Sequence, residues 1–120
     1  MTYSSSEGDE EMDDSQLLRG ILEGCVLSVI ARGETYGYLI LDELQRSGFE
    51  DLFEGTLYPV LTRLEKRGYI SCRREKSPFG PVRKYYSVTG EGREALLSFR
   101  ESYNRITGAC EKVLTTEEEK

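Results

Sequence analysis

The sequence predicts an α+β fold that is mainly helical, and three observations support this prediction. Apolar residues recur at helical spacing in three segments between residues 15 and 67. Two segments rich in β-branched and aromatic residues follow, and the loop between them contains two prolines and a glycine. A final segment, 90–114, carries a single apolar stripe. We therefore expect three helices, a two-stranded hairpin and one long helix.

The first helix is expected from Ser15 to Ala31, with apolar residues over a wide arc. Gly20 and Gly24, four residues apart, weaken a helix but permit close approach of another one. Thr35 then fits the N-cap of a second helix over 36–47. That helix is expected to end at a left-handed Gly48 with Phe49 as the following hydrophobic contact. Its inward side chains are expected to be Leu39, Ile40 and Leu44.

The third helix is expected to begin near Thr56 and to end at Gly68. Pro59 then falls in the first turn, where a missing N–H removes no hydrogen bond. At 100° per residue the helix has an apolar face of Leu57, Val60, Leu61 and Leu64. The opposite face carries Pro59, Thr62, Arg63 and Lys66, with Thr56 and Tyr58 at its edges.

The hairpin is expected to pair strands 69–75 and 82–88 across a loop at 76–81. By alternation, Val82, Lys84, Tyr86 and Val88 share one face, and Arg83, Tyr85 and Ser87 share the other. We expect Tyr86 in the core. Thr89 should cap the last helix, and 115–120 should be a frayed end.

The last helix has apolar residues at steps of three and four, which is a coiled-coil spacing. We therefore interpret 90–114 as a dimerisation helix that packs lengthwise on another helix. The first helix is expected to add to the same interface. The predicted interface residues are Leu18, Leu22, Leu96, Phe99, Tyr103, Ile106, Cys110 and Val113.

The composition excludes several classes of protein. The chain has 120 residues, 38% hydrophobic and 32% charged, as is typical of one soluble globular domain. No segment is apolar enough to span a bilayer, and the acidic start is unlike a signal peptide, so we expect a cytoplasmic protein. Histidine is absent, which excludes histidine metal sites and histidine general bases. No catalytic constellation stands out, so we expect no enzyme activity, no metal and no cofactor.

The charge is segregated along the chain. The net charge is −6, but residues 1–14 hold six acidic residues and no basic one, and the remainder has 16 of each sign. Segment 63–84 contains eight basic and two acidic residues, a net charge of +6. Such segregation decides partners more than the total does. We interpret 1–14 as a disordered acidic tail, which either has no role or competes weakly for the basic segment.

Three helices followed by a basic hairpin make a winged helix-turn-helix, which we assign to residues 15–89. A helix that reads the major groove of DNA needs an apolar face for docking and a polar face for bases and phosphates. The third helix has both, and the hairpin adds basic residues for phosphates. The predicted DNA-binding residues are Thr56, Tyr58, Pro59, Thr62, Arg63, Lys66, Arg73, Arg74, Lys76, Arg83, Lys84 and Tyr85.

The order and spacing of three motifs resemble the PadR family of bacterial transcriptional regulators. The motifs are "YGYLILDEL", "GTLYPVLTRLEKRGYI" and "GPVRKYYSVTGEGREAL", which together span 36–96. The chain is similar to the short form of the family, which has one C-terminal helix. The resemblance implies a homodimer that represses transcription at a two-fold symmetric operator. It also implies that Tyr58, Arg63 and Lys66 on the third helix, and Arg83, Lys84 and Tyr85 on the wing, lie at or near DNA.

Two rival functions remain open at this point: a winged helix that binds protein, and a ligand sensor without direct DNA reading. A small aromatic effector is a candidate partner, with a pocket formed by Leu18, Leu22, Phe99, Tyr103 and Ile106. The chain has no tryptophan to hold a flat ligand. Cys25 and Cys110 are expected to be buried, and Cys72, beside Arg73 and Arg74, is the candidate redox thiol.

Overall fold

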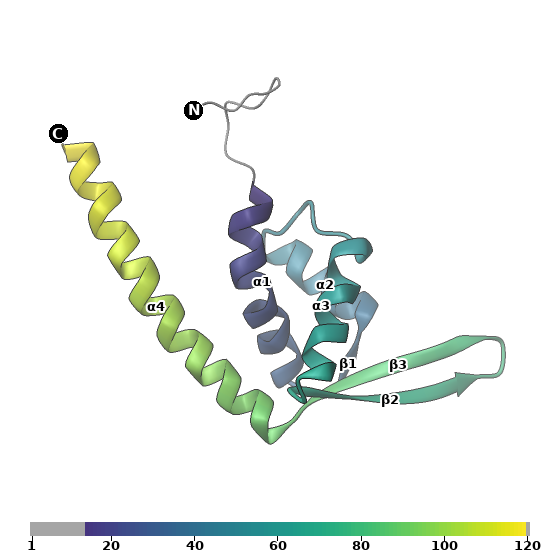
Figure 1. The fold of residues 1–120 in the computed structure, drawn as a ribbon. Coiled ribbons are helices and arrows are strands. Elements are labelled where there is room, and N and C mark those ends of the chain that lie inside the picture. The colour runs from purple at the N-terminus through teal and green to yellow at the C-terminus, as the bar shows by residue number, and fades with distance from the viewer. Residues whose placement is uncertain (1–13, 120) are drawn as a thin grey trace.

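The computed structural model describes residues 14–119, with side chains through residue 115. The interpretation of 1–14 as a disordered tail therefore falls outside the described residues, apart from Asp14. The expected three helices, hairpin and long helix are all present, so the mainly helical α+β winged helix-turn-helix is confirmed (Figure 1). The elements in order are α1 (Asp14–Ala31), β1 (Thr35–Tyr36), α2 (Gly37–Ser47), α3 (Glu54–Lys66), β2 (Ile70–Ser77), β3 (Gly80–Val88) and α4 (Gly90–Glu119).

The core lies where α1, α2 and α3 pack against one another and against the base of the hairpin. The predicted apolar face of α3 is confirmed, since all four of its side chains are buried. Tyr86 on β3 and Ile70 on β2 close the core from the side of the sheet, as expected for Tyr86. The largest fully buried side chains are Val26, Ile30, Ile40, Leu57, Leu61 and Leu64.

The start of α2 differs from the prediction. Thr35 does not cap the helix, because its backbone pairs with Tyr86 in a short strand that completes a three-stranded antiparallel sheet of order β1-β3-β2. The N-cap is Tyr36, which makes no side-chain capping bond. Leu39 is exposed and Leu41 is buried in its place, because the inward face of α2 runs through Gly37, Ile40, Leu41 and Leu44.

The end of α2 agrees with the prediction. Gly48 has a φ of 129°, which favours glycine. Its N–H donates to the Gln45 carbonyl at 3.1 Å, and the Phe49 N–H donates to the Leu44 carbonyl at 3.0 Å. These two bonds satisfy carbonyls that the helix end would otherwise leave unpaired.

Helix α3 begins at Glu54 rather than near Thr56, so Pro59 lies in its second turn and not in its first. Phe53 is the extended N-cap, and its carbonyl accepts the N–H groups of Thr56 and Leu57. The ring of Pro59 removes the hydrogen bond that residue 59 would donate to the Gly55 carbonyl. Burial of the apolar face therefore holds the helix together across this gap.

The hairpin is longer than predicted, because β2 continues through Ser77 and β3 starts at Gly80. Of the two prolines taken as strand breakers, Pro78 lies in the turn and Pro81 lies beyond the stretch that pairs with β1. The register also shifts between Glu75 and Ser77, opposite this part of β3. Proline is tolerated at such unpaired positions.

The junction with α4 is held by Thr89, as expected. Its hydroxyl accepts the Gly92 N–H at 3.0 Å and donates to the Gly68 carbonyl at 2.7 Å. The helix continues to Glu119, beyond the predicted end at Leu114 and through most of the segment expected to fray. Only its first part packs on α1, and its C-terminal end lies apart from the other helices (Figure 1).

We expect Gly92→Ala to destabilise the fold, because a Cβ at Gly92 would overlap the backbone carbonyl of Tyr69. The carbonyl cannot rotate away as a flexible side chain can, so the loss should reach about 1–3 kcal/mol. The matched control is Gly20→Ala in α1, where a Cβ meets nothing within 4 Å and should stabilise the helix by up to about 1 kcal/mol. Urea unfolding of both variants measures the difference, and equal stabilities would refute the packing argument.

Candidate nucleic-acid interface

The face of α3 that points away from the core is formed by Tyr58, Pro59, Thr62 and Lys66, all of them exposed. The Thr62 hydroxyl donates to the Tyr58 carbonyl at 3.1 Å, one turn back along the helix. Thr56 is half-buried in the first turn. Lys66 makes no ion pair with a carboxylate of the described residues. This face therefore keeps a free cation, a hydroxyl and an aromatic ring toward solvent.

Arg63, predicted for the same face, lies instead on the flank of α3 next to α1. Its Nε donates to Oε2 of Glu23 at 2.8 Å, and Arg67 donates to Oε1 of the same carboxylate at 2.8 Å. One α1 carboxylate thus ties the last turn of α3 and its C-cap residue Arg67. A partner 40 residues away leaves no local signal in the sequence, and the predicted role of Arg63 at DNA stays a prediction. Both pairs are partly exposed, so each contributes at most about 1 kcal/mol.

The two faces of the wing differ in charge. Arg74 and Lys84 are directly opposite each other on the same face as buried Tyr86, and neither is in an ion pair with a described carboxylate. Lys76 is exposed at the register shift. This face, which turns toward α3, therefore carries cations that remain available to phosphate. We call Lys66, Arg74, Lys76 and Lys84 the open cations.

Arg73, one of the predicted DNA-binding residues, points to the other face and is paired with two carboxylates there, so its role at DNA stays a prediction. It pairs with Glu34 at 3.0 Å and with Glu75 at 3.0 Å, and it lies 4.7 Å from the centre of the Tyr85 ring. Its hydrogen bond holds the pKa of the Glu34 carboxyl below its usual value. The hydrogen bonds that Arg73 donates to Glu34 and Glu75 raise the pKa of Arg73 in turn.

Tyr85 is half-buried on this second face and does not point toward α3. Its ring meets that of Tyr36 edge to face at 5.5 Å. Arg83 lies over the Tyr36 ring at 5.0 Å, and a hydrogen bond with Tyr85 raises the pKa of Arg83. The aromatic pair and the two arginines thus pack together at the base of the wing. Of these four residues, Tyr36 and Arg83 also line the cleft described next.

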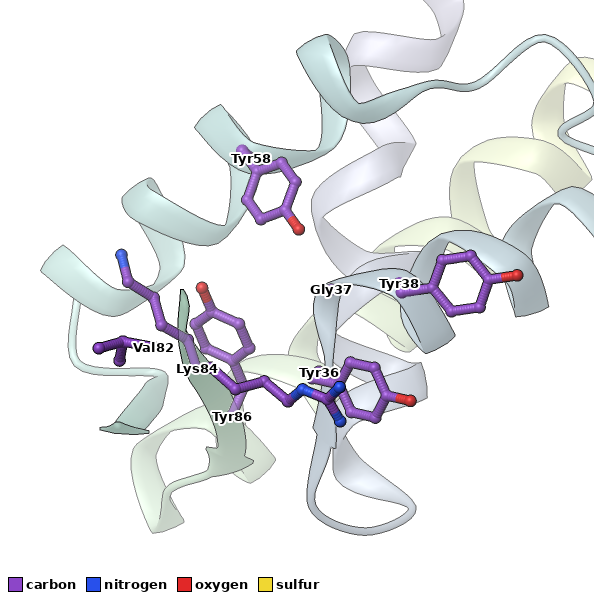
Figure 2. A pocket seen from close by; sticks show the side chains of 8 residues that line it. Tyr36, Gly37, Tyr38, Tyr58, Val82, Lys84 and Tyr86 are labelled. Atoms are coloured by element: carbon purple, nitrogen blue, oxygen red, sulfur yellow. The ribbon is translucent and has the colours of Figure 1, made fainter. Parts of the chain in front are cut away.

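A cleft of about 450 Å³ lies between the start of α2, α3 and β3 (Figure 2). The hydroxyls of Tyr58 and Tyr86 point into it, and Lys84 extends from β3 in the direction of α3 (Figure 2). A Cβ at Gly37 would overlap the Tyr58 hydroxyl, so glycine makes room for this ring. The cleft is lined by Tyr36, Gly37, Tyr38, Tyr58, Val82, Arg83, Lys84 and Tyr86.

Tyr36, Gly37 and Tyr38 line this cleft but are not among the residues predicted for the site. The signal that could have found them is the pattern of two tyrosines around a glycine at the start of a helix. Phenol hydroxyls and ammonium groups are hydrogen-bond donors. A cleft that combines them with arginine is suited to phosphate oxygens.

The predicted interface residues divide into three groups by burial within one protomer. Leu22 and Leu96 are only 3% and 7% exposed, so they belong to the core of the protomer and leave no surface for a partner. Phe99 is half-buried against Gly24 of α1 and stacks on Tyr103 at 5.9 Å. Leu18 is half-buried as well. The side chains that stay exposed are Tyr103, Ile106, Cys110 and Val113.

The cysteines are all free thiols. Cys25 packs on the core as expected, and burial raises the pKa of its thiol. Cys110, expected to be buried, is exposed within one protomer. Cys72 is half-buried beside the core. Its redox role stays a prediction.

Two further observations concern the described residues as a whole. They contain no cluster of three or more metal-binding side chains. None of their helices is long and apolar enough to cross a membrane.

Comparison with known proteins gives a consistent result. The model of the transcriptional regulator PadR-like family matches residues 26–98, more than half of the chain. A transcriptional regulator of Mycobacterium tuberculosis is 33% identical over 81 residues, which cover 68% of this chain and 74% of that protein. An uncharacterized protein of Lysinibacillus sphaericus is 35% identical over 85 residues, which cover 68% and 77%.

Solved structures agree in fold and in sequence. A Streptococcus transcriptional regulator matches with a TM-score of 0.71 and 41% identity, covering 82% of this chain and 96% of that one. A PadR-like transcriptional regulator of Bacillus cereus matches with a TM-score of 0.72 and 38% identity over the same shares. The relatives whose names state a role are transcriptional regulators and not enzymes, in agreement with the expectation from sequence.

We expect stability to fall as the pH rises from about 10 to 12, and Tyr86 to contribute to this fall. Burial raises the pKa of Tyr86 to about 12, whereas tyrosine in an unfolded chain has a pKa of about 10. The unfolded chain therefore loses this proton first, and deprotonation draws the equilibrium toward it. Below pH 10 this contribution is fully present. Tyr86→Phe should lose less stability between pH 9 and pH 11 in urea unfolding, and an unchanged pH dependence would contradict the assignment.

Proposed function

The chain belongs to the PadR-like family of transcriptional regulators, and on this premise we propose that it is a sequence-specific DNA-binding repressor that acts as a homodimer and is released by a small-molecule effector. The observation that carries the proposal is that the basic face of the wing and the exposed face of α3 meet at one cleft. Lys84 of the wing and Tyr58 of the exposed α3 face line the same cleft, and Arg74 lies opposite Lys84 on the wing.

In this proposal α3 enters the major groove with its exposed face toward the bases. The groove is wide enough for one helix. Thr62 and Lys66 then reach base edges or phosphates, while the buried apolar face keeps the helix on its scaffold. The wing lies along the backbone, where Arg74, Lys76 and Lys84 neutralise phosphates. The cleft holds one phosphate between Lys84 and the tyrosine hydroxyls.

A homodimer would place two such helices in successive major grooves, about one helical turn apart. The support comes from α4, because the heptad-spaced side chains beyond Phe99 are exposed in one protomer. Monomeric proteins rarely expose a continuous apolar stripe of this kind. A second copy of α4, with Leu18 and Leu17 of α1 at the margin, covers it most simply.

Effector release follows from the proposed repressor role, since a repressor requires a signal. A ligand shifts the separation of the reader helices only if it binds two dimer conformations differently. Leu22 is removed from the candidate pocket by its burial. The stacked pair Phe99 and Tyr103, with Ile106 beside it, keeps the character needed to hold a flat aromatic molecule.

We expect Lys66→Ala and Lys84→Ala to weaken binding to operator DNA without lowering the melting temperature. Each lost phosphate contact should reduce the slope of log K against log salt by about 0.9. Arg100→Ala in α4 makes the same change of charge far from the wing and serves as the control. The operator is first obtained by selecting bound fragments from the source genome. Binding that is independent of salt, or equal in all three variants, would favour a protein-binding module instead.

We expect Ile106→Asp to convert the dimer to a monomer, because it places a charge in the proposed α4 interface. Leu97→Asp is the matched control. Leu97 is 60% exposed and Ile106 is 54% exposed, yet nine residues of helix place them about 180° apart. Sedimentation velocity distinguishes the two outcomes. A dimer that survives Ile106→Asp but not Leu97→Asp would put the interface on the other face of α4.

A further inference from the structure

The tip of the wing presents an aromatic side chain to solvent. Phe79 is 97% exposed, the highest exposure among the large apolar side chains of the described residues, and the next is Leu17 at 72%. Single exposed apolar residues are common and need no explanation. Phe79 differs because it is an entire phenyl ring at the outermost point of a projecting element.

The wing holds this ring in a defined position. Ser77 and Gly80 are the last pair of the ribbon, so residues 78 and 79 alone make the turn. Pro78 restricts the backbone before the ring, and the Phe79 N–H lies 3.4 Å from the Ser77 hydroxyl, which accepts it. The ribbon extends away from the helices, with the turn at its far end (Figure 1). Any partner that lies along the wing therefore meets Phe79.

The charge of the ribbon selects the kind of partner. Three of the open cations, Arg74, Lys76 and Lys84, stand on the strands that lead to the tip, and none is in an ion pair with a described carboxylate. Such a surface attracts a polyanion. A phenyl ring gains nothing from phosphate oxygens or water, and it is stabilised only by apolar or aromatic surface. Duplex DNA offers negative charge and aromatic surface together, since stacked bases lie at the floor of the minor groove between the phosphate backbones.

We propose that Phe79 is a wedge that enters the minor groove beside the half-site read by α3 and partly unstacks one base step. The inference rests on the proposed DNA binding and adds to it a residue that deforms the operator. Insertion of an apolar side chain bends the duplex toward the major groove. Pyrimidine–purine steps unstack at the lowest cost, so Phe79 confers a preference for such a step without any hydrogen bond to a base.

The test uses the full-length protein and an operator duplex selected from genomic fragments. Fluorescent dyes at the two ends report bending by energy transfer, and 2-aminopurine in the minor-groove step beneath the wing reports unstacking. Wild type should shorten the distance between the ends and brighten 2-aminopurine. Phe79→Ala should lose both signals and about tenfold in affinity, as for one well-buried interface side chain. Phe79→Leu should retain most of each signal, because leucine is also an apolar wedge.

Leu97→Ala is the control, since Leu97 is an exposed apolar residue of α4 that belongs neither to the wing nor to the cleft lining. It should bend the operator as wild type does. Equal bending and equal 2-aminopurine fluorescence for wild type and Phe79→Ala overturn the wedge while leaving the repressor proposal intact. A Phe79→Ala variant that changes only the sedimentation coefficient also overturns it, because the ring then contacts another protein copy. If wild type binds no genomic fragment, the DNA-binding proposal itself fails, and the wedge fails with it.

Discussion

Burial of the apolar face of α3 is the constraint on which the rest of the arrangement depends. Leu57, Leu61 and Leu64 are almost fully enclosed between α1, α2 and the base of the sheet. A helix fixed on one side has no freedom to rotate, so the direction of every other α3 side chain is decided by its angular distance from these leucines. Lys66 is turned to solvent, while Arg63 and Arg67 are turned toward α1 and share the carboxylate of Glu23. The chemistry of the exposed surface is therefore a consequence of packing on the opposite side.

Periodicity predicted the helices, the hairpin and the buried faces of α3 and β3, because these are properties of neighbouring residues. It gave the wrong inward residue in α2, because the buried face follows the spacing of Gly37, Ile40, Leu41 and Leu44 and leaves Leu39 outside it. It also could not detect β1, since two residues are too few to carry an alternating pattern. Breaker residues shortened the predicted hairpin, whereas in the structure the unpaired stretch near the tip accommodates Pro81.

Residue types and spacing predicted cations on α3 and on the wing, but not which of them are paired within the protein. Arg63 and Arg73 are paired with Glu23 and Glu34, which are 40 and 39 residues distant in sequence. A count of charges within a window treats every cation as free, so it overstates the surface available to a polyanion. The structure separates the cations that hold the fold from the open cations. It also brings the tyrosines at the start of α2 to the wing, a proximity created by the pairing of β1 with β3.

The 30 residues of α4 make it a rod of about 45 Å anchored at one end by Thr89 and Gly92. Such a rod is a lever with its fulcrum at the wing. A rotation of about 5° at the junction carries the far end through about 4 Å, which is close to the rise of three residues of helix. If two copies pair along α4, a displacement at the far end of the helix corresponds to a small rotation at the junction. The position of the wing then changes by a small amount. In the proposed homodimer, the spacing of the two wings would depend on this tightly packed junction, and sequence changes along α4 would alter which operators fit while the wings themselves stay the same.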